Sequence, residues 1–257
     1  MTATIDTPAD PGAAAAGAAR VAAMLATTPE TIDGVVAHLE ALQEIVDDAY
    51  GPRDGVGAFN RLYTRITRGI RAQLDDDLFT DRDFLVRFDV EFARRYFHAL
   101  LADAGGGTPP RSWGVLLDRR HDRRVSPLEL AVVGVNAHVN YDLAPAVVRT
   151  CTVLGRSGPG PAERADYRAV NDVFSLHMVR LLDGYDTADP GTVSLSEQLL
   201  GTVADVPVVL AREVAWRQAL ELWELRSRPM AYENEVAALD RRTALLGRGL
   251  LTLGALT

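Results

Sequence analysis

The stretch SPLELAVVGVNAHVNYDLAP, residues 126–145, decides the fold class. It opens with Ser126, Pro127 and Glu129, which are the capping serine, first-position proline and third-position glutamate of a helix start. As far as Val139 the following residues are apolar on nearly every side, which is typical of a helix that is buried on most of its surface. Such a helix needs other helices around it, so the stretch predicts the centre of a helical bundle.

Helical periodicity continues through most of the chain after about residue 28, because apolar residues recur every three or four positions. We therefore predict an all-α fold, a single-domain bundle of about seven to nine helices over residues 28–257. The predicted helices lie at 28–48, 57–74, 80–101, around Trp113, from 127 onward, and at 163–184, 193–202, 206–228 and 231–246.

Residues 1–27 consist mostly of Ala, Thr, Pro and Gly, so we predict a disordered N-terminal tail. The chain shows neither a signal peptide nor an apolar run of about 18 residues. The expected location is therefore the cytoplasm.

Composition excludes several classes of function. The net charge of −8 argues against non-specific nucleic-acid binding and against docking on anionic membranes. All 27 basic residues are arginine, so Schiff-base chemistry, pyridoxal phosphate attachment and a Walker A lysine are excluded. The single cysteine, Cys151, permits neither an intramolecular disulfide nor a cysteine-based zinc cluster. No nucleotide-binding glycine motif is present, so we expect no NAD, FAD or ATP as cofactor.

Four polar residues interrupt the buried helix, namely Asn136, His138, Asn140 and Asp142. Buried polar groups are costly unless they are paired, so these residues form either a site or a structural network. His138 and Asp142 are four residues apart and share a helical face, where the carboxylate can orient the imidazole as a general base. Asn136 and Asn140, on another face, are candidates for binding a carbonyl or a neighbouring helix. In the structural alternative, Asp142 caps a helix that resumes at Leu143.

Further candidates lie on other predicted helices. Tyr167 and Asn171 share one face of the helix at 163–184 and are candidates for binding the substrate, since an asparagine in mid-helix indicates a specific partner. Arg95 and Tyr96 are candidates for binding an anion or a carbonyl, and Trp113 is a candidate pocket wall. By contrast, Arg212, Glu213 and Arg217 are expected to form a solvated or bridging set on a helix face.

These residues resemble an actinobacterial family of unknown function whose members carry the signature NAHIN-x-DLP. The resemblance covers about residues 50–225, and this chain has Val139 for the isoleucine and a proline one position late, at Pro145. It implies a shared fold and site rather than a particular reaction. The matching segments are Asp81–Leu101, Trp113, Asn136–Leu143, Asp166–Tyr167 with Asn171, and Arg212–Trp216.

A weaker resemblance links His138-x3-Asp142 to the zinc-binding helix of zinc-dependent phospholipase C. It implies zinc ligands at His138 and Asp142, with His177 and His98 as the other histidines in a suitable context. A multinuclear site would need more ligands than these.

We therefore predict an enzyme that uses His138 and Asp142 for acid–base chemistry on a small, largely apolar metabolite, a role that suits secondary metabolism. Asn136, Asn140 and Asn171 would hold a carbonyl or hydroxyl, with help from Arg95 or Tyr96. One alternative is a metal-dependent hydrolase, with a divalent ion such as zinc on His138 and Asp142. The other is a non-enzymatic ligand-binding or structural helical protein. The expected partner is a small molecule, and the oligomeric state stays open.

Overall fold

The computed structural model describes residues 11–74, 79–171 and 205–254. Regular structure in these residues is entirely helical, which confirms the predicted all-α single domain. None of the helices in this part of the chain combines the length and the apolar character needed to cross a membrane.

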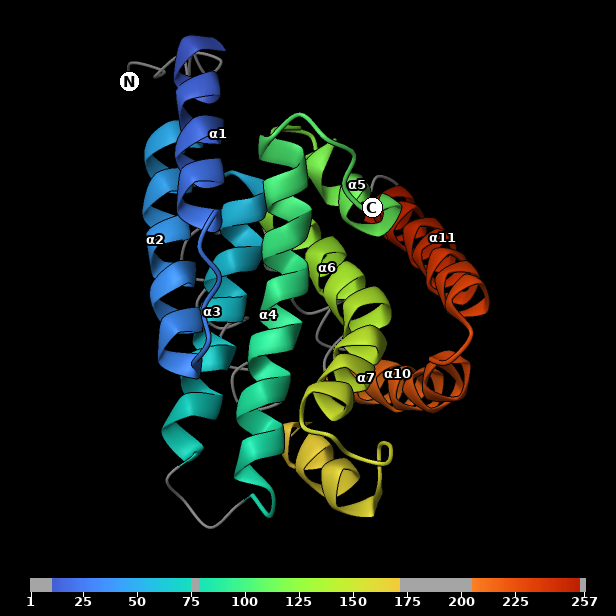
Figure 1. The fold of residues 1–257 in the computed structure, drawn as a ribbon. Coiled ribbons are helices and arrows are strands. Elements are labelled where there is room, and N and C mark those ends of the chain that lie inside the picture. Colours follow the sequence, from blue (N-terminus) through green and yellow to red (C-terminus); the bar gives the residue numbers. More distant parts are fainter. Residues whose placement is uncertain (1–10, 75–78, 172–204, 255–257) are drawn as a thin grey trace.

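Most of the helices surround one long central helix, residues 127–153, which we call the rod (Figure 1). The helices are α1 (Pro11–Leu25), α2 (Ile32–Tyr50), α3 (Gly55–Gln73), α4 (Arg82–Ala104), α5 (Arg111–Leu117), α6 (Pro127–Ala137), the π-helical turn η1 (His138–Asp142), α7 (Leu143–Val153), α10 (Asp205–Leu225) and α11 (Pro229–Gly254). Residues 161–171 are also helical, and they agree with the start of the helix predicted at 163–184. The rest of that helix and the helix predicted at 193–202 lie outside the described residues.

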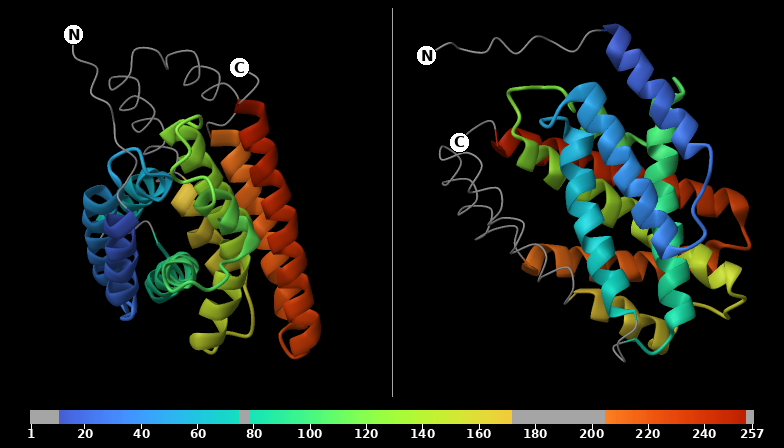
Figure 2. Two further views of the ribbon diagram at one scale, coloured as in Figure 1. Left: turned by 90° about the horizontal axis from the view of Figure 1, so that it is seen from above. Right: turned by 90° about the vertical axis from the view of Figure 1, so that its left-hand side faces the viewer.

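The helices pack in layers (Figure 2). On one side, α1 and α2 lie together, and α2 packs on α3. The rod formed by α6, η1 and α7 lies in the middle, where α3 packs on α6 and α4 packs on α7. On the other side, α10 covers α7 and α11 covers α5 and α6. The rod is therefore covered from both sides, as its apolar sequence predicts.

The central rod begins as its sequence indicates and then changes its winding. Ser126 and Glu129 form a capping box at the start of α6. The helix passes into a π-helical turn at His138–Asp142 and continues as α7 without a break. Pro145 cannot donate a backbone hydrogen bond to Tyr141, and such a loss of the regular pattern favours a local change of winding. The rod therefore does not end before Pro145 but continues through a π turn.

Helical structure begins earlier in the chain than predicted. Residues 11–25, assigned to a disordered tail from composition, form the helix α1. Val21 and Leu25 are buried against the bundle, and the Tyr50 hydroxyl donates to the carbonyl of Ala14 at 3.1 Å. Alanine has the highest intrinsic helix propensity. Contacts with the rest of the bundle supply the stability that a short, sparsely apolar helix lacks on its own.

Helix starts follow the capping residues of the sequence. Thr31 caps α2, and Asp54 caps α3 by accepting a hydrogen bond from Gly57. Asp81 caps α4. Cys151 is buried in the core, and burial raises the pKa of its thiol to about 12.

Gly134 allows α3 and α6 to approach closely, which gives a testable consequence. A Cβ atom at Gly134 would lie 2.6 Å from the ring of the buried Phe59. We expect Gly134→Ala to lower the free energy of unfolding by about 1–3 kcal/mol, the usual cost of overpacking. Chemical denaturation followed by circular dichroism measures this change.

Gly114 provides the control, because among the described residues a Cβ there meets no atom within 4 Å beyond its own stretch of helix. Gly114→Ala in α5 is expected to raise the stability by about 0.5–1 kcal/mol, since alanine loses less backbone entropy than glycine. Equal effects of the two substitutions would contradict the close approach at Gly134.

Candidate functional site

His138 and Asp142 form a buried hydrogen-bonded pair inside η1. The Nδ1 atom of His138 lies 3.0 Å from the Oδ2 atom of Asp142. The two residues are only 3% and 1% exposed. The pairing expected from their spacing of four residues is therefore present, but Asp142 does not cap α7, because its side chain makes no capping hydrogen bond there.

Two donors from other helices also bind Asp142. Arg95 of α4 donates from Nε to Oδ1 at 3.1 Å, and Trp113 of α5 donates from Nε1 to Oδ2 at 2.8 Å. Both residues were predicted to bind substrate, and in the structure they hold the carboxylate instead. Three donors satisfy both carboxylate oxygens, which offsets the cost of burying the charge.

The pairing also determines which nitrogen of His138 is free. Because both oxygens of Asp142 act as acceptors, the Nδ1 atom of His138 carries the proton that it donates. The Nε2 atom then holds a lone pair. It is buried and has no hydrogen-bond partner among the described residues.

Aromatic rings enclose the imidazole of His138. Phe92 stacks on it with 3.6 Å between ring centroids, and Tyr63 meets it edge-on at 4.6 Å. Burial lowers the pKa of His138 below its ordinary value of 6.5, and the hydrogen bond and charge of Asp142 offset only part of that effect. The imidazole is therefore neutral at pH 7 and able to accept a proton.

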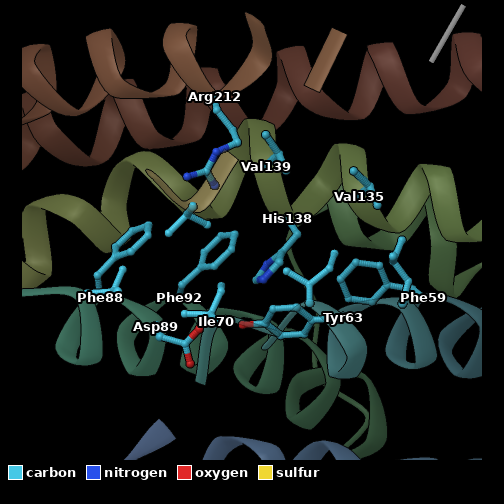
Figure 3. Close-up of a pocket in the computed structure, with 14 residues that line it drawn as sticks. Phe59, Tyr63, Ile70, Phe88, Asp89, Phe92, Val135, His138, Val139 and Arg212 are labelled. Carbon is cyan, nitrogen blue, oxygen red and sulfur yellow. The ribbon is translucent and has the colours of Figure 1, made fainter. Parts of the chain in front are cut away.

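The free side of His138 faces a cavity between α3, α4 and the rod (Figure 3). The cavity has a volume of about 40 Å³, and its lining is mostly apolar. One buried water needs about 10–15 Å³, so the space takes about three waters or a small organic molecule. The lining residues are Phe59, Leu62, Tyr63, Ile66, Ile70, Leu85, Phe88, Asp89, Phe92, Val135, His138, Val139, Val170 and Arg212.

Arg212 is buried at one end of this cavity, which corrects the expectation of a solvated position on α10. Its Nε atom donates to Asn171 Oδ1, and its Nη2 atom donates to the carbonyl of Tyr167 at 2.7 Å. The Tyr167 hydroxyl donates to the carbonyl of Arg212 at 2.7 Å. Tyr167 and Asn171, predicted to bind substrate, thus attach residues 161–171 to α10. Glu213 matches the expectation of a bridging set, since it pairs with Arg168 and Arg164.

The remaining predicted substrate-binding residues are absent from the cavity lining. Asn136 donates to the carbonyl of Thr243 in α11 at 3.0 Å and accepts from Asn140 at 3.1 Å. The two asparagines therefore join the rod to α11, which is the helix–helix role left open for them. Tyr96 is packed between Phe59 and Trp113, and its hydroxyl lies 3.5 Å from the Asn60 side chain.

The histidines of the zinc alternative do not add to the pair. His98 is exposed on α4, and His177 lies outside the described residues. Within residues 11–74, 79–171 and 205–254, no three His, Cys, Asp or Glu residues form a group suited to a metal ion.

Two polar residues of the cavity, Tyr63 and Asp89, are not among the site residues predicted from the sequence. Tyr63 lies four residues after Phe59 and three before Ile66, so its spacing is that of an apolar core position. Asp89 is spaced four residues from Leu85 and three from Phe92, so it occupies a position of the apolar face of α4. A single carboxylate at such a position is the signal that could have revealed it, because charged residues are seldom fully buried without a partner.

The fold and site define a class: an all-α domain whose central helix carries a buried histidine–aspartate pair beside a small apolar cavity. The chain belongs to a family of unknown function, DUF5995, which matches residues 32–253. No curated protein and no solved structure matches the chain.

Proposed function

We propose that this protein is an enzyme that uses His138 as a general base on a small, largely apolar molecule. The observation that supports the proposal is the Nε2 atom of His138, which has no hydrogen-bond partner among the described residues and is buried at an apolar cavity while Nδ1 is held by Asp142. A buried ring nitrogen without a partner has a cost in stability, and such costs are typical of functional sites.

The surroundings suit proton abstraction. Proton transfer to Nε2 creates an imidazolium next to the Asp142 carboxylate, which stabilises the new charge at short range. Arg95 and Trp113 fix the position of that carboxylate. Stacking on Phe92 fixes the plane of the ring. A positioned base of this kind contributes about 10²–10⁴-fold to a rate.

Turnover by wild-type protein and by His138→Gln tests the proposal. Small neutral ketones, esters and epoxides of three or four heavy atoms are incubated with each protein in D₂O, and ¹H NMR follows deuterium exchange and hydrolysis. We expect wild-type protein to turn over at least one of these compounds and His138→Gln to lose at least about 100-fold of that rate.

Asn140→Ala is the matched control, because Asn140 lies in the same π turn but bonds to Asn136 rather than to the cavity. It should keep the wild-type rate. An inactive wild-type protein, or equal rates for wild type and His138→Gln, would contradict the proposal and favour the non-enzymatic alternative.

A further inference from the structure

Two more polar side chains reach the same cavity as His138. Tyr63 comes from α3 and Asp89 from α4, and they are 4% and 3% exposed. The Oη atom of Tyr63 and the Oδ2 atom of Asp89 are buried without a hydrogen-bond partner among the described residues. Both groups lie below the imidazole of His138 in Figure 3, where the Tyr63 hydroxyl points toward the side occupied by Asp89. Three unpartnered polar atoms thus belong to the walls of one small cavity.

The two side chains are hydrogen-bond donors at neutral pH. Burial raises the pKa of Asp89 to about 7, so a large share of the carboxyl groups carries a proton there. Burial, and next the charge of Asp89, raise the pKa of Tyr63 well above its ordinary value of 10, so its hydroxyl stays protonated. His138 Nε2 is an acceptor. The cavity therefore offers two donors and one acceptor within an apolar wall.

This arrangement favours a neutral ligand over an anion. The apolar lining disfavours a buried negative charge. Arg212, the cation among the described residues of the cavity wall, already uses Nε and Nη2 to bind Asn171 and Tyr167. A neutral molecule with one acceptor oxygen and a proton beside it would satisfy all three unpartnered atoms.

We propose that Tyr63 and Asp89 donate hydrogen bonds to the oxygen of a small neutral carbonyl compound whose adjacent C–H group faces His138 Nε2. In this step the C–H proton passes to Nε2, and the C–H electron pair forms a carbon–carbon double bond. The carbonyl π electrons move to the oxygen, which becomes an enolate oxygen bound by the two donors. Return of the proton from Nε2 to carbon completes a balanced enolisation. The role of His138 here rests on the proposed function, whereas binding of the oxygen does not.

Binding of [2-¹³C]acetone tests the donor pair, because acetone has four heavy atoms and an acceptor oxygen. The carbonyl ¹³C shift is titrated against wild-type protein at pH 6 and pH 9. We expect saturable binding at pH 6 with a downfield shift, and binding weaker by about tenfold at pH 9, where Asp89 is ionised and no longer donates. Among the described residues, the other charged or titratable groups of the cavity wall are Tyr63 from α3, His138 from η1 and Arg212 from α10, with Asp142 behind His138. Of these groups, only His138 has an ordinary pKa between pH 6 and pH 9, and burial lowers its pKa.

Three variants identify the donors. Asp89→Asn keeps a donor that cannot ionise, so its affinity should be the same at both pH values. Tyr63→Phe should weaken binding by about five- to tenfold at both. Tyr96→Phe is the matched control, since Tyr96 also contacts the imidazole but is not part of the cavity lining, and it should bind as wild type.

The proposal is overturned by absence of saturable binding at pH 6, by a pH dependence that persists in Asp89→Asn, or by acetate binding more tightly than acetone. Acetone binding without deuterium exchange in wild type would contradict the proposed function and leave the donor pair intact. Exchange that depends on His138 but not on Tyr63 or Asp89 would retain the base and reject the donor pair.

Discussion

Asp142→Ala is expected to lower the free energy of unfolding by about 2–6 kcal/mol. The substitution leaves the buried donors of Trp113 and His138 without an acceptor, and each such loss costs about 1–3 kcal/mol. Loss of the hydrogen bond from Arg95 lowers the free energy of unfolding by less, because this side chain is 27% exposed and can bind water instead. Since whole domains are stable by about 5–15 kcal/mol, the loss is a large fraction of the total. Urea unfolding at pH 7, followed by circular dichroism, measures it.

Asp142→Asn is the matched variant, because it keeps the shape of the side chain and one acceptor oxygen. That oxygen can still accept from Trp113 and His138, so at least half of the stability lost in the alanine variant should return. If both variants are as stable as wild type within about 1 kcal/mol, then Asp142 does not hold these helices together. A His138→Ala substitution, by contrast, leaves Asp142 bound by Arg95 and Trp113. That substitution therefore does not create an unpaired buried charge.

Asp89→Asn is expected to stabilise the protein at alkaline pH. Burial raises the pKa of Asp89 from its ordinary value of 3.8 to about 7. Between these pH values the folded state binds more protons than the unfolded state, so this residue makes the wild-type protein less stable as pH rises. Asparagine does not ionise. The stability of Asp89→Asn relative to wild type should therefore increase by about 4 kcal/mol between pH 4 and pH 8.5. Denaturant titrations of both proteins at each pH measure this difference.

Asp54→Asn gives the contrast, because Asp54 is also buried but is paired. Burial alone would raise the pKa of Asp54, but the hydrogen bond with His121 and the guanidinium of Arg120 outweigh it and hold the pKa below 3.8. This pairing stabilises the folded state above pH 3.8 and is lost as pH falls through the lowered pKa. Asp54→Asn should therefore be less stable than wild type at pH 7. A stability difference for Asp89→Asn that does not change with pH would show that the Asp89 carboxyl is solvated.

The sequence alone determined the features that depend on neighbours along the chain. The helix start at Ser126 follows from capping, since the cap and the amide that it binds are three residues apart. The pairing of His138 with Asp142 follows for the same reason, because residues four apart share a helical face. Burial of the central rod follows from its composition.

Only the tertiary structure decided which helix meets which polar side chain. Arg95 and Trp113 reach Asp142 from 47 and 29 residues away, so no local spacing connects them. Likewise Asn136 binds Thr243 across 107 residues rather than a ligand. Tyr63, Asp89 and His138 come from three separate elements and form one cavity only after these pack together. Periodicity shows which face of a helix is buried, but the identity of the covering helix depends on long-range packing, in which many apolar pairings have similar energies.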